Sequence, residues 1–300
     1  MRSERPLERR DAGVTRAQKE SGKLHSGDSQ GKLFIISLGP GHRSYMAREA
    51  LDALESAEIV LGYKTYLDLV TDLLRNKTVV SSGMRKEVER CQAAIDHALS
   101  GKHVALLSSG DAGIYGMAGL VLDICKKKQI NVFASGGEER AGSSGFVLRV
   151  IPGIPAFNAA ASLLGAPLMH DFAAVSLSDL LTPWELIEKR LSAAAAADFV
   201  LALYNPRSKS RPDLLEKARR IILAHRSAET PAAIVRQAMR EGQWKCLTTF
   251  GRLPLDEVDM QSVVIVGNSQ TYIWNGWMVT PRGYLDKYSI TAPSAECEQD

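Results

Sequence analysis

The stretch that decides the fold is Leu33-Phe34-Ile35-Ile36-Ser37-Leu38-Gly39-Pro40-Gly41. It begins with a short, mostly apolar run, typical of a buried strand, and the glycines and proline that follow predict a tight turn. Residues 44–57 then place apolar side chains at helical spacing, with Ser44 as the expected N-cap. We therefore predict a strand, a glycine turn and a helix, the repeating unit of a parallel sheet.

The same alternation continues along the chain. Further strands are expected at 59–61, 78–80, 103–107, 146–151, 199–204, 232–235, 245–250 and 262–266. Further helices are expected at 66–74, 86–99, 117–128, 156–164, 183–197 and 212–225. Strands that alternate with helices indicate an α/β fold. We divide the chain into a disordered polar tail (1–31), an N-terminal α/β domain (32–152), a C-terminal α/β domain (153–286) and a second tail (287–300), with a glycine- and serine-rich insertion at 135–145.

Composition and charge indicate an ordinary globular protein and name no partner. The 300 residues are 45% hydrophobic and 24% charged, with a formal net charge of +3. The first thirty residues hold seven basic and five acidic side chains, so most of this charge belongs to the tail. We therefore expect no nucleic-acid partner. No apolar run is long enough to span a bilayer, so no membrane partner is expected, and four scattered cysteines favour a reduced, cytoplasmic compartment.

Several common catalytic motifs are missing from the sequence. The first glycine turn has Ser44 where a dinucleotide-binding GxGxxG motif has its third glycine. No phosphate-binding GxxxxGK[ST] loop and no GxSxG nucleophile motif occur. The six histidines show no metal-ligand spacing. The sequence therefore gives no support to a dehydrogenase, a P-loop NTPase or a serine hydrolase, and we expect no bound metal.

Three glycine-containing turns follow three of the expected strands. They lie at 39–41, 109–116 and 152–156. The carboxyl ends of strands in an open α/β sheet line the ligand site, and glycine there lets a ligand approach the backbone closely. Each turn alone is consistent with a purely structural role. Together they predict one shared site for a small molecule.

These turns also carry a resemblance to a known family. LGPG at 38–41, SGDAGIYGMA at 109–118 and VIPGI at 150–154 follow in the order seen in tetrapyrrole methylases, which are S-adenosylmethionine-dependent enzymes of corrin and sirohaem synthesis. Later stretches look like the precorrin-3B C-17 methyltransferase branch of that family: APLMHDF at 166–172, SLSDLLTPWE at 176–185, LYNPRSKSR at 203–211, IVGNSQTY at 265–272 and TPRGY at 280–284. The resemblance spans residues 32–284.

The resemblance implies the tetrapyrrole methylase fold, two α/β domains with both ligands in the cleft between them. It also implies S-adenosyl-L-methionine as methyl donor, S-adenosyl-L-homocysteine as product, and a homodimer. In relatives the cofactor is held mainly by backbone groups. The residues that would hold it here are Pro40, Ser109, Gly110, Asp111, Ile114, Pro155, Ala156, Asn205 and Ala238.

The resemblance further implies precorrin-3B as acceptor, methylated at C-17 with ring contraction to precorrin-4, in cobalamin biosynthesis. Its carboxylate arms need cationic or backbone donors. The candidates near expected strand ends are Gly39, Gly41, His42, Arg43, Arg207, Lys209 and Arg211. For each charged residue the alternative is a solvated surface charge.

Ring contraction requires a general base for the C-20 hydroxyl. The candidates are Asp179, Ser178, His170 and His42, with Asp171 placed to fix the tautomer of His170. Helix capping and a buried, satisfied histidine are the alternatives, so the base stays unassigned. Two other functions stay open: a precorrin or cobalt-precorrin methyltransferase acting at another carbon, and a non-catalytic tetrapyrrole-binding protein.

Overall fold

The computed structural model describes residues 30–134, 144–208 and 211–288. Four parts of the expected organisation therefore lie outside the described residues: residues 1–29 of the tail expected at 1–31, most of the insertion at 135–145, Lys209, and residues 289–300 of the second tail. The inner tail boundaries differ slightly from expectation. The Gly31 carbonyl already accepts a hydrogen bond from the Val147 amide at 2.9 Å, and the last helix reaches Lys287.

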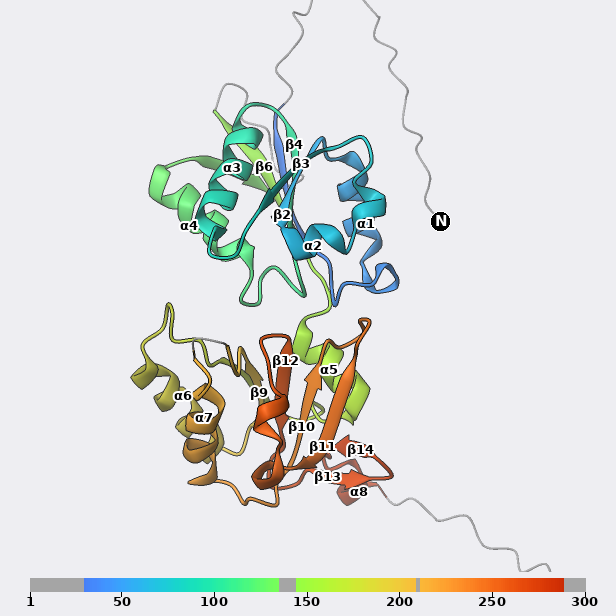
Figure 1. Ribbon diagram of the computed structural model, residues 1–300, viewed down its shortest axis with the longest axis vertical. Coiled ribbons are helices and arrows are strands. Elements are labelled where there is room, and N and C mark those ends of the chain that lie inside the picture. Colours follow the sequence, from blue (N-terminus) through green and yellow to red (C-terminus); the bar gives the residue numbers. More distant parts are fainter. Residues whose placement is uncertain (1–29, 135–143, 209–210, 289–300) are drawn as a thin grey trace, which may run out of the picture.

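The N-terminal half is built on a six-stranded sheet. Its strands are β1 (Lys32–Ser37), β2 (Ile59–Tyr63), β3 (Thr78–Ser82), β4 (His103–Ser108), β5 (Asn131–Ala134) and β6 (Gly145–Ile151). Their order is β3-β2-β4-β1-β6-β5, and every pairing is parallel. The sheet therefore places β4, β1 and β6 side by side, with the three glycine-containing turns at one edge (Figure 1).

Helices cover both faces of this sheet. Alternate residues of β1 point to opposite sides, so this strand presents apolar side chains to the helices on each face. Leu33 and Ile35 pack with α3 (Glu87–Leu99) and α4 (Met117–Lys128). Ile36 and Leu38 pack with α1 (Arg48–Ser56) and α2 (Lys64–Asp68). The sheet is thus buried on both faces, as its apolar strands predict.

The C-terminal half is built on a five-stranded mixed sheet, ordered β11-β10-β12-β9-β8. The strands are β8 (Phe172–Ser176), β9 (Val200–Tyr204), β10 (Pro231–Arg236), β11 (Trp244–Thr249) and β12 (Ser262–Val266). One face packs on α6 (Trp184–Ala196) and α7 (Leu214–Leu223), and the other on α5 (Ala156–Leu164). Strand β12 is antiparallel to both β9 and β10, so the carboxyl ends of β8, β9 and β10 lie at the same edge.

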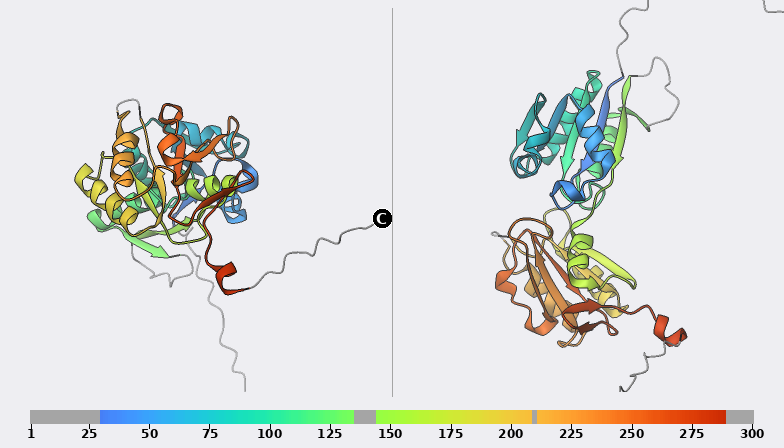
Figure 2. Two further views of the ribbon diagram at one scale, coloured as in Figure 1. Left: turned by 90° about the horizontal axis from the view of Figure 1, so that it is seen from below. Right: turned by 90° about the vertical axis from the view of Figure 1, so that its right-hand side faces the viewer.

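A small third sheet, β13-β14-β7, completes this half: β7 (Gly165–Ala166), β13 (Tyr272–Trp274) and β14 (Trp277–Val279), followed by α8 (Tyr284–Lys287). The chain passes from one half to the other between β6 and α5, and the two halves are stacked along the long axis of the molecule (Figure 2). No helix among the described residues is long and apolar enough to span a membrane.

The α/β class is as the sequence predicts, and most elements lie where the patterns place them. The first helix is an exception, since α1 begins at Arg48 and residues 43–45 form a separate 3₁₀ turn. His42, not Ser44, caps that turn: its Nδ1 accepts a hydrogen bond from the Ser44 amide at 3.2 Å. Strands β5, β7, β8, β13 and β14 were not expected. Four of them are only two to four residues long, and β8 (FAAVS) contains two alanines, a residue type that is depleted in strands.

Candidate functional site

The turns after β1, β4 and β6 contact one another through their backbones. Gly39 and Gly110 exchange two hydrogen bonds, with amide-to-carbonyl distances of 3.0 and 2.8 Å. Both have positive φ angles, 62° and 66°, a region that favours glycine. A Cβ on Gly153 would lie 2.6 Å from the Gly110 carbonyl oxygen. The sequence pattern therefore brings the three turns together because glycine allows this close approach.

Asp111 fastens two of these turns. One carboxylate oxygen accepts from the Gly113 amide at 2.8 Å, and the other accepts from the Gly153 amide at 3.0 Å. The Ser37 hydroxyl accepts from the amide of buried Ala112 at 2.9 Å. In this structure the Asp111 carboxylate shapes the turns around it by binding backbone amides.

The carboxyl edge of the second sheet meets these turns. The Tyr115 hydroxyl, from the turn after β4, donates to the Ala174 carbonyl of β8 at 3.0 Å, and its ring centroid lies 5.2 Å from that of Tyr204. The Tyr204 hydroxyl accepts from the Phe157 amide at 3.0 Å. Burial raises the pKa of Tyr204 to about 12, so this phenol is protonated at neutral pH.

Arg240 contacts the turns after β1 and β4, although the sequence did not indicate it as a site residue. It lies in the turn between β10 and β11, and donates from Nε to the Pro40 carbonyl and from Nη2 to the Ser109 hydroxyl, the latter at 2.8 Å. A Cβ on Gly41 would lie 3.1 Å from its Nε. Burial lowers the pKa of the guanidinium. The only sequence signal was a basic residue in a turn that follows a predicted strand.

Seven of the nine expected cofactor residues belong to the turns after β1, β4 and β6, whereas Asn205 and Ala238 follow β9 and β10 of the second sheet. Gly110 and Ala156 face each other, since a Cβ on Gly110 would lie 3.7 Å from the Ala156 amide nitrogen. Asn205 follows β9 in a left-handed conformation with φ of 51°, and its side-chain amide donates to the Ser176 hydroxyl at 2.9 Å. Pro155 is the N-cap of α5, Ile114 closes a turn on the Asp111 carbonyl, and Ala238 packs on the α5 side of the second sheet.

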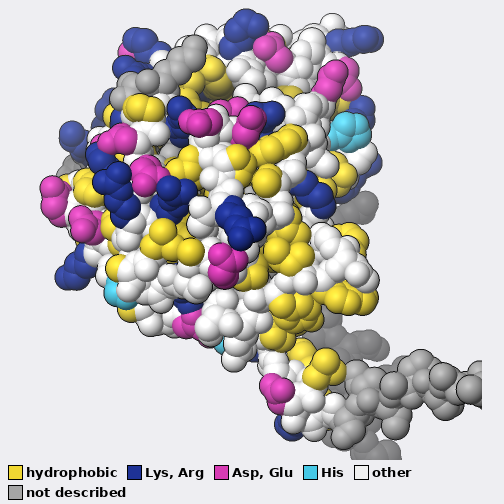
Figure 3. All heavy atoms as spheres, turned by 60° about the horizontal axis from the view of Figure 1, so that its bottom comes forward, with side chains coloured by type: hydrophobic (Ala, Val, Ile, Leu, Met, Phe, Trp, Pro, Cys, Tyr) yellow, Lys and Arg dark blue, Asp and Glu magenta, His cyan; other side chains and the backbone are white. Residues whose placement is uncertain are grey.

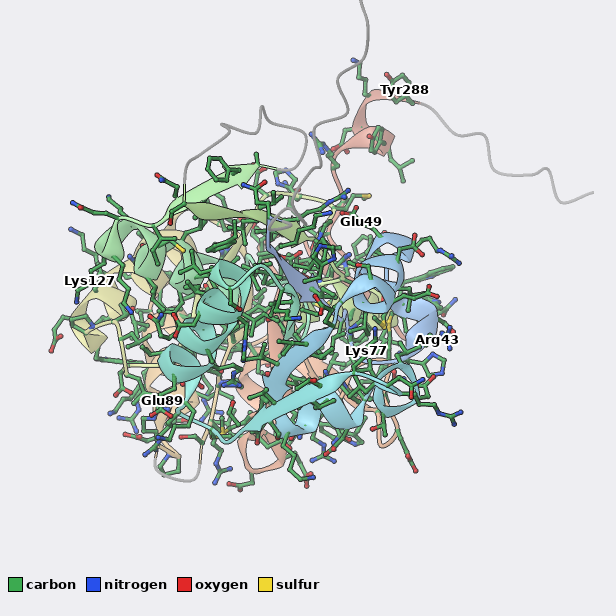
Figure 4. The ribbon with its side chains drawn as sticks, turned by 90° about the horizontal axis from the view of Figure 1, so that it is seen from above. Arg43, Glu49, Lys77, Glu89, Lys127 and Tyr288 are labelled. Atoms are coloured by element: carbon green, nitrogen blue, oxygen red, sulfur yellow. The ribbon has the colours of Figure 1, made fainter. Side chains whose placement is uncertain are left out.

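The expected substrate arginines are already paired with carboxylates. Arg43 is exposed, lies at the outer rim of the molecule (Figure 4), and pairs with Asp72 at 3.4 Å. Arg207 donates to the Leu255 carbonyl at 3.0 Å and lies 3.5 Å from Asp256. Lys209 lies outside the described residues. A ligand carboxylate at Arg43 or Arg207 would have to compete with these partners.

The three candidate bases do not lie together. Arg211 donates to the Ser178 hydroxyl at 3.1 Å and to the Asp179 carboxylate at 2.7 Å, which joins the turns after β8 and β9. His170 precedes β8, at the opposite end of that strand from Ser178. Its Nδ1 accepts from the Asp171 amide at 2.8 Å, and it lines a surface pocket with Asp198 and Asn268. The structure therefore separates His170 from the turns.

Metal-ligating side chains are not gathered in the part of the chain that the structure describes. No three His, Cys, Asp or Glu residues there are grouped closely enough to hold a metal ion. The facing turns instead offer backbone amides and carbonyls, the Ser109 hydroxyl and small side chains at Gly110, Ala156 and Ala238. Such a site suits an organic ligand held by hydrogen bonds.

The fold and these turns define a class of protein. Residues 32–254 match the sequence model of the Tetrapyrrole (Corrin/Porphyrin) Methylases, so the chain belongs to this family. It is 52% identical to a "Probable cobalt-factor III C(17)-methyltransferase" of Salmonella typhimurium, over 84% of this chain and 99% of the relative. It is 36% identical to a "Precorrin-3B C(17)-methyltransferase" of a Sinorhizobium species, over 81% of this chain and 91% of the relative. The crystal structure of the methyltransferase CobJ is similar, with a TM-score of 0.76 and 33% identity over 84% of this chain and 100% of that one.

Proposed function

We propose that this protein transfers a methyl group from S-adenosyl-L-methionine to C-17 of precorrin-3B, with contraction of the ring to precorrin-4, in cobalamin biosynthesis. The proposal rests on the hydrogen bonds that hold the three turns together opposite the edge of the second sheet. They join Gly39 to Gly110, and Asp111 to Gly153. The cobalt-containing acceptor, cobalt-factor III, is the second candidate. The 52% identity to the Salmonella typhimurium relative, against 36% to the Sinorhizobium protein, favours it.

The residues at the turns fit an S-adenosyl-L-methionine molecule. When bound, this cofactor supplies an already activated methyl group on a positive sulfonium, so the protein has to align the reactants and provide carbonyl oxygens nearby. We assign this binding to Pro40, Ser109, Gly110, Asp111, Ile114, Pro155, Ala156, Asn205 and Ala238. Asp111 contributes by fixing the turns, because both of its carboxylate oxygens bind backbone amides.

For the ring contraction we assign the proton transfer to Asp179 and Ser178. Arg211 stabilises the Asp179 carboxylate by a direct ion pair and leaves the proton of the Ser178 hydroxyl free to donate, because that oxygen accepts the Arg211 hydrogen bond. His170 is omitted from this assignment, since it lies at the far end of β8. Gly39, Gly41, His42, Arg43, Arg207, Lys209 and Arg211 stay candidates for substrate contact.

We also propose a cytoplasmic homodimer whose protomer is divided at residue 152 into two α/β domains. The dimer surface we assign is the apolar face formed by β13, β14 and α8, where Tyr272, Ile273, Trp274 and Trp277 are all at least 41% exposed. Figure 3 shows apolar side chains gathered beside the point where the chain leaves through α8. Strand β13 is an edge strand, so its outer backbone groups are open to a second copy.

Incubation of the protein with methyl-labelled cofactor and either precorrin-3B or cobalt-factor III tests the proposal. We expect label at C-17 of a contracted ring by NMR. Label at another carbon, or an uncontracted ring, would overturn the assignment in favour of another precorrin methyltransferase. Calorimetric titration separates the non-catalytic alternative: a protein that fails to bind S-adenosyl-L-homocysteine at micromolar concentration has no methyl donor site.

A further inference from the structure

Arg90 is a buried cation that pairs with no carboxylate in the part of the chain that the structure describes. It lies on the core-facing side of α3 and is 5% exposed, and its Nε has no hydrogen-bond partner. Among the described residues, no carboxylate oxygen comes within 4.0 Å of its guanidinium. Arg226 is similarly buried but pairs with Asp198 and donates to the Phe199 carbonyl. An unpaired buried charge is unfavourable for folding, so the fold gains nothing evident from Arg90.

Arg240 is a second arginine without a carboxylate partner among the described residues, and it is half-buried. It contacts the turns after β1 and β4 through the neutral Pro40 carbonyl and Ser109 hydroxyl. It makes no ion pair within 4.0 Å among the residues that the structure describes. A guanidinium has five N–H donors in a planar fork, so Arg240 keeps donors for a further acceptor.

Tyr66 connects the two arginines electrostatically. The charges of Arg240 and Arg90 both act to lower the pKa of its phenol. Burial raises the pKa of Tyr66, so its hydroxyl stays protonated and can donate. Glu87 is the acidic group that acts on Tyr66, yet neither arginine lies within 4.0 Å of it, and its Oε1 accepts from the Arg85 amide at 3.3 Å. The three side chains thus combine two positive charges with a neutral donor.

The three residues come from elements around the carboxyl edge of the first sheet. Tyr66 is on α2, directly after β2, Arg90 is in the first turn of α3, after β3, and Arg240 reaches in from the second sheet. This is the edge where a parallel sheet binds its ligands. The local charge is positive and unbalanced, which suits a carboxylate held in a bidentate manner.

We propose that Arg90, Arg240 and Tyr66 form the subsite that binds one carboxylate arm of the tetrapyrrole acceptor. This inference rests on the proposed function, which supplies the class of ligand. It adds to the sequence-based candidates. Arg43, Arg207 and Arg211 pair with Asp72, Asp256 and Asp179, whereas Arg90 and Arg240 pair with no carboxylate among the described residues. The carboxylate of the cofactor's methionine portion has the same chemistry, so the test must distinguish the two.

The test uses Arg90→Met, which keeps the size and removes the charge, beside Arg90→Lys and the exposed control Arg75→Met. Affinities are measured for uroporphyrin III, a stable polycarboxylate tetrapyrrole, and for S-adenosyl-L-homocysteine. For Arg90→Met we expect the tetrapyrrole dissociation constant to rise at least tenfold, with a weaker salt dependence, and cofactor affinity to change less than twofold. The tetrapyrrole dissociation constant of Arg90→Lys should lie between those of the wild type and Arg90→Met. Arg240→Gln should weaken tetrapyrrole binding as well.

A change of less than twofold in tetrapyrrole affinity for Arg90→Met would overturn the proposal. So would a tenfold loss confined to S-adenosyl-L-homocysteine, which would assign the subsite to the cofactor. Melting temperature separates a ligand-binding role of Arg90 from a structural one. If Arg90 serves a ligand, Arg90→Met should melt at the same temperature as the wild type or higher. If Arg90 stabilises the fold, Arg90→Met should melt at a lower temperature. Failure of the proposed function is seen separately, as absence of methyl transfer by the wild-type protein.

Discussion

Gly153 holds a position that no other residue type can occupy without moving its neighbours. Its missing Cβ would lie 2.6 Å from both the Gly110 carbonyl oxygen and the Ser37 Cβ. We expect Gly153→Ala to lower the free energy of unfolding by about 1 to 3 kcal/mol, because the turns must separate, and to weaken binding of S-adenosyl-L-homocysteine. Urea denaturation and calorimetric titration measure these effects.

The matched control is Gly119→Ala in α4, where an added Cβ meets nothing within 4 Å. It should be neutral or stabilise the protein by up to about 1 kcal/mol, since alanine favours a helix interior. Equal cofactor affinity in Gly153→Ala and wild type would contradict the role given to the turns.

Tyr204 should make the stability of the protein fall in alkali. Burial raises its pKa to about 12 in the folded state, against an ordinary value of 10.0 for a tyrosine in the unfolded chain. Below pH 10 the phenol is protonated in both states; above it the unfolded chain releases the proton first. The free energy of unfolding should therefore decline between pH 10 and about 12. Tyr204→Phe should show a shallower decline in urea denaturation over this range, and an unchanged decline would contradict the prediction.

At the scale of elements, one ion pair connects the end of α6 to the end of α7. Asp198 follows α6 with φ of 62°, pairs with Arg226, and accepts from the Ser269 amide at 3.1 Å and hydroxyl at 2.7 Å. We expect Asp198→Asn to cost roughly 2 to 3 kcal/mol of unfolding free energy, because Arg226 is left buried and unpaired. Asparagine tolerates positive φ, so backbone strain is not added.

Chemical denaturation measures this cost. Asp213→Asn is the control, since Asp213 forms an exposed ion pair with Lys217 and its loss should hardly change stability. The double variant Asp198→Asn, Arg226→Met should recover part of the loss. Equal stability of Asp198→Asn and Asp213→Asn would show that the connection between α6 and α7 does not depend on this pair.

At the scale of the whole molecule, the dimer that we propose through the apolar face of β13, β14 and α8 should depend on Trp274. This side chain is 64% exposed on an edge strand. We expect Trp274→Lys to convert a dimer into a monomer in sedimentation equilibrium, because a charge would be buried in the interface. Leu122→Lys, at an exposed position of α4, should leave the dimer intact. A monomeric wild type would exclude the dimer. A dimeric Trp274→Lys variant would place the interface elsewhere.

The sequence by itself determined the α/β class and which turns lie together. Apolar runs ending in Gly39, Ser109 and Pro152 could be recognised locally, and parallel strands necessarily end at one edge. Strand β5 has only four residues, too few for a periodic pattern, and β8 contains two alanines in place of a β-branched run, so the pattern predicts neither strand. The sequence also contained a signal that was not used: Arg90 stands at a core-facing position of an otherwise apolar helical stripe.

Only the tertiary structure decided how charges are paired. Arg211 and Arg90 are equally basic in the sequence, yet Arg211 meets Asp179 while Arg90 meets no carboxylate among the described residues. Only the tertiary structure also decided that two candidate bases lie apart. His170 and Ser178 are close in sequence but lie at opposite ends of β8. Hydrophobic periodicity is a local property that a sequence displays directly. Polar contacts join residues up to 200 positions apart, such as the Arg240 guanidinium and the Pro40 carbonyl, and are fixed only when the chain is folded.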